Sequence, residues 1–74
     1  MGADFKIIHY DKVVSVIVDM TMHEAIALAD YLEKEGFEVD ELRIQSATKT
    51  TQLLLSKTKS DKLMDALAFY FKHL

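Results

Sequence analysis

Residues 5–18, with the sequence FKIIHYDKVVSVIV, decide the fold because they form a β-hairpin pattern with apolar side chains on both faces. A two-residue turn at Asp11-Lys12 places Phe5 opposite Val18 in an antiparallel pair. Side chains alternate along a strand, so one face of this hairpin is almost wholly apolar and needs a cover. That face carries Phe5, Ile7, His9, Val14, Val16 and Val18.

The opposite face of the hairpin is half apolar, which is more than a strand facing only water requires. This mixture predicts either partial burial or a binding surface. The residues on this second face are Lys6, Ile8, Tyr10, Val13, Ser15 and Ile17.

A helix is predicted after the hairpin, running to about Glu35. Thr21 and Glu24 have the spacing of a capping box, and Gly36 stands where a helix commonly ends in the left-handed conformation. The apolar residues recur at helical spacing and predict the buried side of the helix. They are Met22, Ala25, Ile26, Ala29 and Leu32, widened by Leu28 and Tyr31.

The second half of the chain predicts another hairpin and another helix. Strands are expected over 42–47 and 50–56, joined by a turn at Thr48-Lys49, and a change of alternation predicts a β-bulge or a short bend at Asp40-Glu41. The last helix is expected from Asp61 to about His73. Its inward residues are predicted to be Leu63, Leu67, Tyr70 and Leu74, flanked by Met64, Ala66 and Phe71.

The two halves resemble each other at a spacing of 37 residues. This spacing aligns the apolar face of the first hairpin with Leu42, Ile44, Ser46, Thr51, Leu53 and Leu55. We therefore predict a single α+β domain over 1–74, with the order ββαββα and pseudo-repeat units 5–36 and 42–74. Its four antiparallel strands form one sheet, with both helices on one face.

Three alternatives remain open at this stage. The similarity can arise from the packing demands of ββα units rather than from gene duplication. A βαββαβ arrangement is common at this size, but it leaves the final helix without a place. The long strands can also pair with those of a second chain.

The composition of the chain limits the classes of function and the cellular compartment that can be expected. The 74 residues carry a net charge of −3 and contain no cysteine, so disulfides and thiolate metal sites are excluded and a cytoplasmic location is expected. The apolar runs are too short and too often interrupted by charge to cross a membrane.

Enzyme activity is not expected from the sequence. His9, His23 and His73 lack metal-ligand spacing, and no glycine-rich phosphate loop or paired nucleophile and base is present. We therefore predict no catalytic residue, no metal and no cofactor.

Association with a protein is the favoured function. The outward sheet face is predicted to present Ile8, Tyr10, Val13, Ile17 and Leu54, with Ala47, inside a polar border, and Phe69 on the last helix offers a second surface. These features predict a homodimer or a partner-binding module. By analogy of size, its role is that of an adaptor, regulator or inhibitor of the kind often encoded by phages and mobile elements.

The alternative is phosphate or nucleic-acid binding by the basic second hairpin and the start of the last helix. The acidic first half of the chain and the scarcity of outward aromatic side chains count against this alternative. The residues concerned are Arg43, Lys49, Lys57, Lys59 and Lys62.

Overall fold

The computed structural model describes residues 5–45, 47, 50–56 and 60–73. The predicted order ββαββα is confirmed. The elements are β1 (Phe5–His9), β2 (Val13–Val18), α1 (Met22–Lys34), β3 (Val39–Gln45), β4 (Thr50–Ser56) and α2 (Ser60–Lys72).

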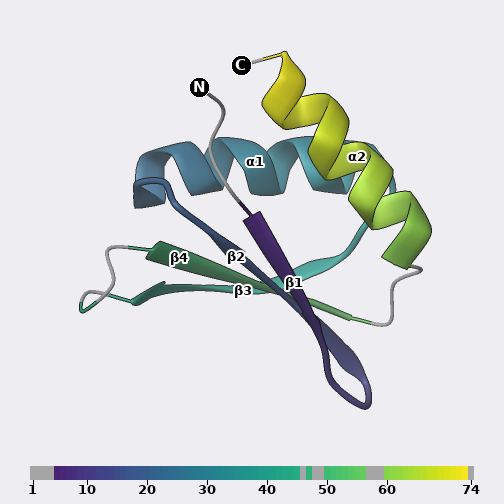
Figure 1. Cartoon of the computed structure of the whole chain (residues 1–74), viewed down its shortest axis with the longest axis horizontal. Helices are drawn as coiled ribbons and strands as arrows, with labels where there is room; N and C mark the ends of the chain where they lie inside the picture. Colours follow the sequence, from purple (N-terminus) through teal and green to yellow (C-terminus); the bar gives the residue numbers. More distant parts are fainter. Residues whose placement is uncertain (1–4, 46, 48–49, 57–59, 74) are drawn as a thin grey trace.

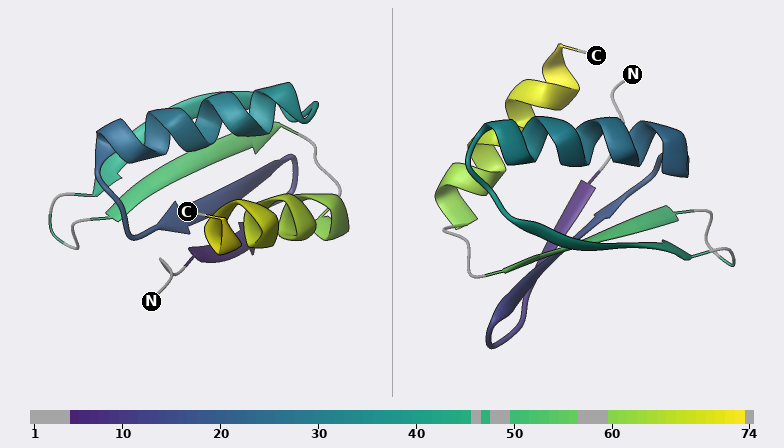
Figure 2. Two further views of the ribbon diagram at one scale, coloured as in Figure 1. Left: turned by 90° about the horizontal axis from the view of Figure 1, so that it is seen from above. Right: turned by 180° about the vertical axis from the view of Figure 1, so that it is seen from behind.

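The four strands form one antiparallel sheet in the order β1-β2-β4-β3, and both helices lie on the same face of it (Figures 1 and 2). Helix α1 packs over β3 and β4. Helix α2 reaches β1, where the ring of Phe71 stacks on that of Phe5 with centroids 5.3 Å apart. The predicted two-layer architecture is therefore confirmed.

The first hairpin has the predicted register. Phe5 lies opposite Val18 and Ile7 opposite Val16, and the Tyr10 N–H donates to the carbonyl of Val13 at 2.9 Å across the turn. The apolar face of β2 turns toward the helices, where Val14, Val16 and Val18 are buried. This face forms the centre of the core.

Strands β2 and β4 join the two halves of the molecule. Val16 lies opposite Leu53, the residue that matches it at the spacing of 37. At the same spacing Val14 matches Thr51 and Val18 matches Leu55, so the cross-strand pair Val14–Leu55 corresponds to the pair Thr51–Val18. An approximate twofold axis therefore passes between Val16 and Leu53.

The second hairpin departs from its predicted register. Gln45 lies opposite Thr50, whereas a two-residue turn at Thr48-Lys49 would place Ala47 there. Strand β3 also begins at Val39, earlier than predicted, and the predicted bulge falls between Val39 and Glu41. Because the register differs by two residues, each side chain keeps its predicted face. Ser46, Thr48 and Lys49 lie outside the described residues.

Parts of the predicted helix faces are wrong. Ile26 was expected in the buried stripe but is 47% exposed, and the buried residues of α1 are Ala25, Leu28, Ala29 and Leu32. In α2 the sequence places Phe71 at the side of the buried face, but its side chain is buried, because its ring stacks on that of Phe5 in β1. Leu74 lies outside the described residues.

Both ends of α1 have the predicted caps. The Thr21 N–H donates to Glu24 Oε1 at 3.0 Å, and the Glu24 N–H donates to Thr21 Oγ1 at 3.3 Å. At the other end Gly36 has φ +96°, and the Phe37 N–H donates to the carbonyl of Leu32 at 3.0 Å. The helix therefore begins and ends where its sequence signals lie.

Gly36→Ala is expected to lower the free energy of unfolding by about 1 kcal/mol, because a side chain resists positive φ. No atom lies within 4 Å of an added Cβ, so the cost comes from the backbone alone. Urea unfolding measures it, and Gly36→Asn serves as the control because asparagine tolerates this conformation better. Equal stability of wild type and Gly36→Ala would contradict the positive φ of Gly36.

The capping box predicts a pH dependence of stability. Hydrogen bonds from the backbone and then the side chain of Thr21 hold the pKa of Glu24 below its ordinary value of 4.5. A depressed pKa means that the carboxylate stabilises the fold above its unfolded-state pKa and loses this effect as the pH falls through the folded-state pKa. The stability advantage of wild type over Glu24→Gln should therefore shrink below pH 4.5 in urea unfolding series.

Candidate interaction surfaces

The face of the sheet turned away from the helices has an aliphatic centre. Ile8, Ser15 and Leu54 lie side by side across three strands, and Lys6, Ile17 and Gln52 form the next row. The two helices cover only the opposite face (Figure 2). We call this the outer sheet face.

The members of the outer sheet face that belong to paired strands lie together there. Ile8, Val13, Ile17 and Leu54 are half-buried, Tyr10 is 56% exposed, and Ala47 is exposed in the turn after β3. Ser15 is buried among them and accepts a hydrogen bond from Gln52 Nε2 at 2.6 Å. Neighbouring aliphatic side chains therefore shield one another even where no helix covers them.

Charged side chains border the outer sheet face. Arg43 and Glu41 follow the alternation of β3 onto this side, and their ion pair raises the pKa of Arg43. Lys6 lies on the opposite edge strand. An aliphatic centre inside a charged border is the usual anatomy of a protein interface.

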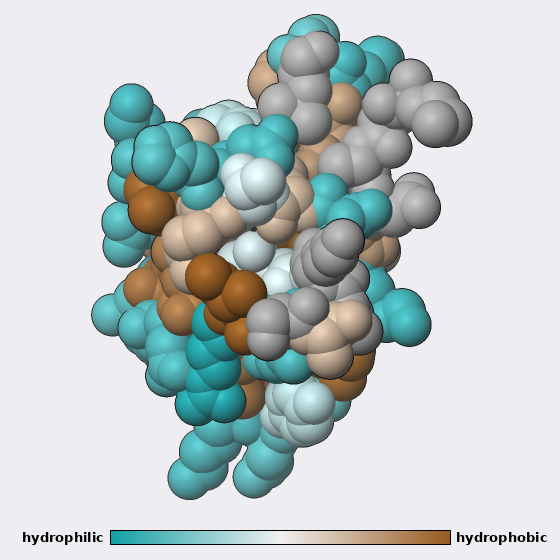
Figure 3. Space-filling model, turned by 90° about the vertical axis from the view of Figure 1, so that its left-hand side faces the viewer, coloured by the Kyte–Doolittle hydropathy of each residue, from teal (hydrophilic) through white to brown (hydrophobic). Residues whose placement is uncertain are grey.

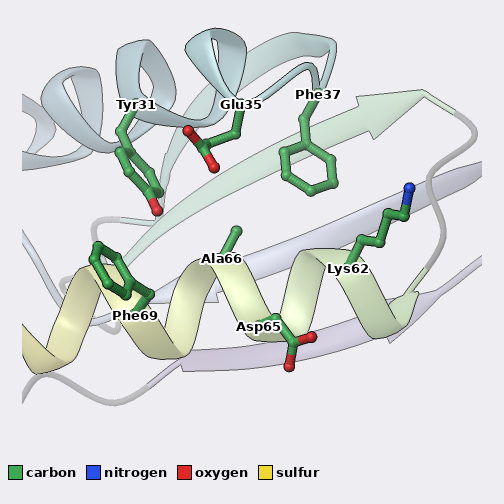
Figure 4. Close-up of a pocket in the computed structure, with 7 residues that line it drawn as sticks. All are labelled: Tyr31, Glu35, Phe37, Lys62, Asp65, Ala66 and Phe69. Atoms are coloured by element: carbon green, nitrogen blue, oxygen red, sulfur yellow. The ribbon is translucent and has the colours of Figure 1, made fainter.

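A second surface is a groove of about 520 Å³ between the two helices, which we call the interhelical groove. Figure 4 shows Tyr31, Glu35 and Phe37 pointing toward α2, while Asp65 turns away from the groove. Phe69, the residue predicted on α2, is 56% exposed and lies beside Tyr31 (Figure 4). The groove is lined by Tyr31, Glu35, Phe37, Lys62, Asp65, Ala66 and Phe69.

Aromatic contacts hold one end of the interhelical groove in place. The rings of Tyr31 and Tyr70 lie 5.0 Å apart, and the ring of Phe69 lies 4.3 Å from that of His73. Loss of solvent, and then the carboxylate of Glu35, raises the pKa of Tyr31. Phe69 and Lys62 are candidate residues from the sequence, each for a different partner, but the sequence does not predict the groove itself, because its lining comes from both helices and from the segment after α1.

The basic residues of the phosphate-binding alternative are not gathered in the described part of the chain. Arg43 lies on the outer sheet face in an ion pair with Glu41, whereas Lys62 lines the interhelical groove in the other layer. Lys49, Lys57 and Lys59 lie outside the described residues. Arg43 and Lys62 therefore do not form one phosphate site.

His9 is exposed and lines a shallow depression of α2 and β1 together with Ile7, Asp61, Met64 and Asp65. Among the residues that the structure describes, no group of three or more histidine, cysteine, aspartate or glutamate side chains is arranged to hold a metal ion.

Within the described residues, no helix has the length and apolar character needed to cross a bilayer. Comparisons of the chain with protein-family models, with curated proteins and with solved structures find no significant match.

Proposed function

We propose that this chain is a small, non-catalytic protein-interaction module that forms a homodimer through the outer sheet face. The observation that carries the proposal is the group of half-buried aliphatic side chains on the side of the sheet that no helix covers. In this role the chain acts as an adaptor, regulator or inhibitor. Its lack of cysteine fits a cytoplasmic location.

The energetics favour covering this face. Each Å² of apolar surface removed from water contributes about 25 cal/mol, and a small domain gains much of its missing burial by association. A standard interface needs about 800 Å² from each partner. The four aliphatic side chains are already half-buried, so the interface must also take in Tyr10 and the polar border.

The approximate twofold axis relates only the central residues of the outer sheet face to one another, since Ile8 and Val13 fall on the polar residues Gln45 and Thr50. Ile17 and Leu54 match at the spacing of 37, as do Ser15 and Gln52. A symmetric dimer uses the same surface on both subunits, so a second copy would lay one aliphatic centre against another. This supports a second copy of the chain as the partner.

Phe69 and the interhelical groove offer the other surface for the same function, in the opposite layer.

Sedimentation velocity of the pure wild-type chain over a wide concentration range tests self-association. We expect the sedimentation coefficient to rise from the monomer value to the dimer value with concentration. A monomer at every concentration would remove the homodimer, and substitutions on the two layers identify the surface.

A further inference from the structure

A groove of about 290 Å³ runs between α1 and the edge strand β3, which we call the edge groove. Its β3 residue Leu42 faces the helices, on the side of the sheet opposite the outer sheet face, and only Glu41 borders both surfaces. On the helix side Ile26, Asp30 and Glu33 recur at the spacing of one helix face and line it. Since β3 is the last strand of the sheet, the groove is open at its side.

Two large aliphatic side chains, one on α1 and one on the helix-facing side of β3, are left exposed at this edge of the sheet. Ile26 on α1 is 47% exposed, and Ile44 is 60% exposed although it shares the helix-facing side of β3 with Leu42. At the end of the molecule that carries the start of α1 and the end of β3, Figure 3 shows hydrophobic surface set among hydrophilic surface. The sequence pattern predicts that both isoleucines are buried. They are exposed because the sheet ends at β3 and no further strand of the described part of the chain covers them.

The edge strand can pair with one more strand. In an antiparallel sheet every second residue of an edge strand directs its N–H and C=O away from the sheet. Beyond the bulge, β3 is regular from Leu42 to Ile44. An extended segment laid beside these residues gains main-chain hydrogen bonds, and every second side chain of that segment enters the edge groove.

The edge groove is acidic. Four carboxylates and no basic side chain line it. Glu41 is engaged by Arg43, and Asp40 accepts a hydrogen bond from Ser56. The side-chain carboxylates of Asp30 and Glu33 have no hydrogen bond or ion pair within the described part of the chain, so they remain for a partner of opposite charge.

We propose that the edge groove binds an extended basic segment of another protein as a fifth strand beside β3. Lysine or arginine side chains of that segment lie against Asp30 and Glu33, and an aliphatic side chain covers Ile26 and Ile44. The β3 strand of a second copy is a poor occupant, because it would bring Asp40 and Glu41 to the same carboxylates. This site does not depend on the proposed homodimer.

The probe is a capped peptide, Thr-Lys-Thr-Val-Thr-Lys-Thr, whose alternation puts lysine and valine on one side of a strand. It is titrated into the isotope-labelled full chain and followed by NMR. We expect backbone amide shifts concentrated in residues 42–44 and 26–33. Replacing lysine by glutamate in the peptide, or methylating the alternate backbone nitrogens that face β3, should abolish binding.

Matched variants separate this site from general attraction of a cation to an acidic protein. Asp30→Asn/Glu33→Gln should bind the peptide about fivefold more weakly. Asp19→Asn/Asp65→Asn removes the same charge elsewhere and should bind like wild type, and so should Ile17→Lys. Equal weakening by both double variants, full binding of the N-methylated peptide, or no binding at low salt would each overturn the proposal.

Discussion

Leu53→Ala is expected to lower the free energy of unfolding by about 3 kcal/mol, a large part of the stability of a domain this small. Leu53 is fully buried in an inner strand of the sheet, where it lies between Val16 on one side and Leu42 on the other. Its removal leaves a cavity at the approximate twofold axis, where the two halves meet. Urea unfolding followed by circular dichroism measures the loss.

Ile44→Ala is the matched control, because the sequence pattern assigns both positions to the apolar side of the second hairpin. Ile44 is 60% exposed, so its truncation should cost less than about 1 kcal/mol. Similar losses for the two variants would show that the edge of the sheet is covered in solution, and would contradict the exposure seen here.

Local signals allowed much of the fold to be predicted. The register of the first hairpin follows from strict alternation on one face and a short connection, and the limits of α1 follow from Thr21, Glu24 and Gly36. Each of these signals acts over a few residues, so it can be recognised without knowledge of the tertiary contacts, and here the local preferences agree with the whole fold. The order ββαββα follows from repeating the same signals at a spacing of 37.

The second hairpin was predicted less well because its turn is weakly specified. No glycine or asparagine fixes the connection after β3, so the pairing of Gln45 with Thr50 is set by the sheet as a whole. Strand β3 is an edge strand with the charged residues Asp40, Glu41 and Arg43. Alternation alone therefore identified neither its start nor the exposure of Ile44.

Helix faces also depend on what lies opposite them. The apolar positions of α1 cover more than one side of the helix, so periodicity does not choose between Ile26 and Leu28 as the buried residue. The sheet beneath α1 ends at β3, and Ile26 lies beside that edge, where it lines the edge groove and stays 47% exposed. Likewise Phe71 is buried because β1 supplies Phe5, a contact between the two ends of the chain.

The candidate surfaces also differ in whether local sequence patterns predict them. Alternation placed Ile8, Ile17 and Leu54 on one sheet face, because strand geometry alone decides which side chains share a face. The two grooves form between elements that are distant in sequence, such as α1 and α2. No local pattern marks such grooves, and among the residues that line the interhelical groove the sequence indicates only Phe69 and Lys62 as candidate binding residues.

Ile17→Lys is expected to weaken the proposed homodimer by at least about 30-fold while the chain stays folded. Ile17 lies in β2 at the centre of the outer sheet face, so a twofold contact would bring two introduced ammonium groups close together in an apolar interface. Its side chain is only half-buried in the single chain, which lets a lysine extend to water. Sedimentation velocity measures the dissociation, and circular dichroism checks the fold.

Two further variants make this experiment decisive. Leu54→Lys changes the residue that matches Ile17 under the spacing of 37, and should dissociate the dimer to a similar extent. Phe69→Lys makes the same change of charge on α2 and also removes a large apolar side chain, but it lies in the opposite layer and should leave the dimer intact. If Phe69→Lys alone dissociates the dimer, the two copies meet at the interhelical groove instead. The reason is that a charge weakens a dimer only where it replaces an apolar side chain that the contact buries.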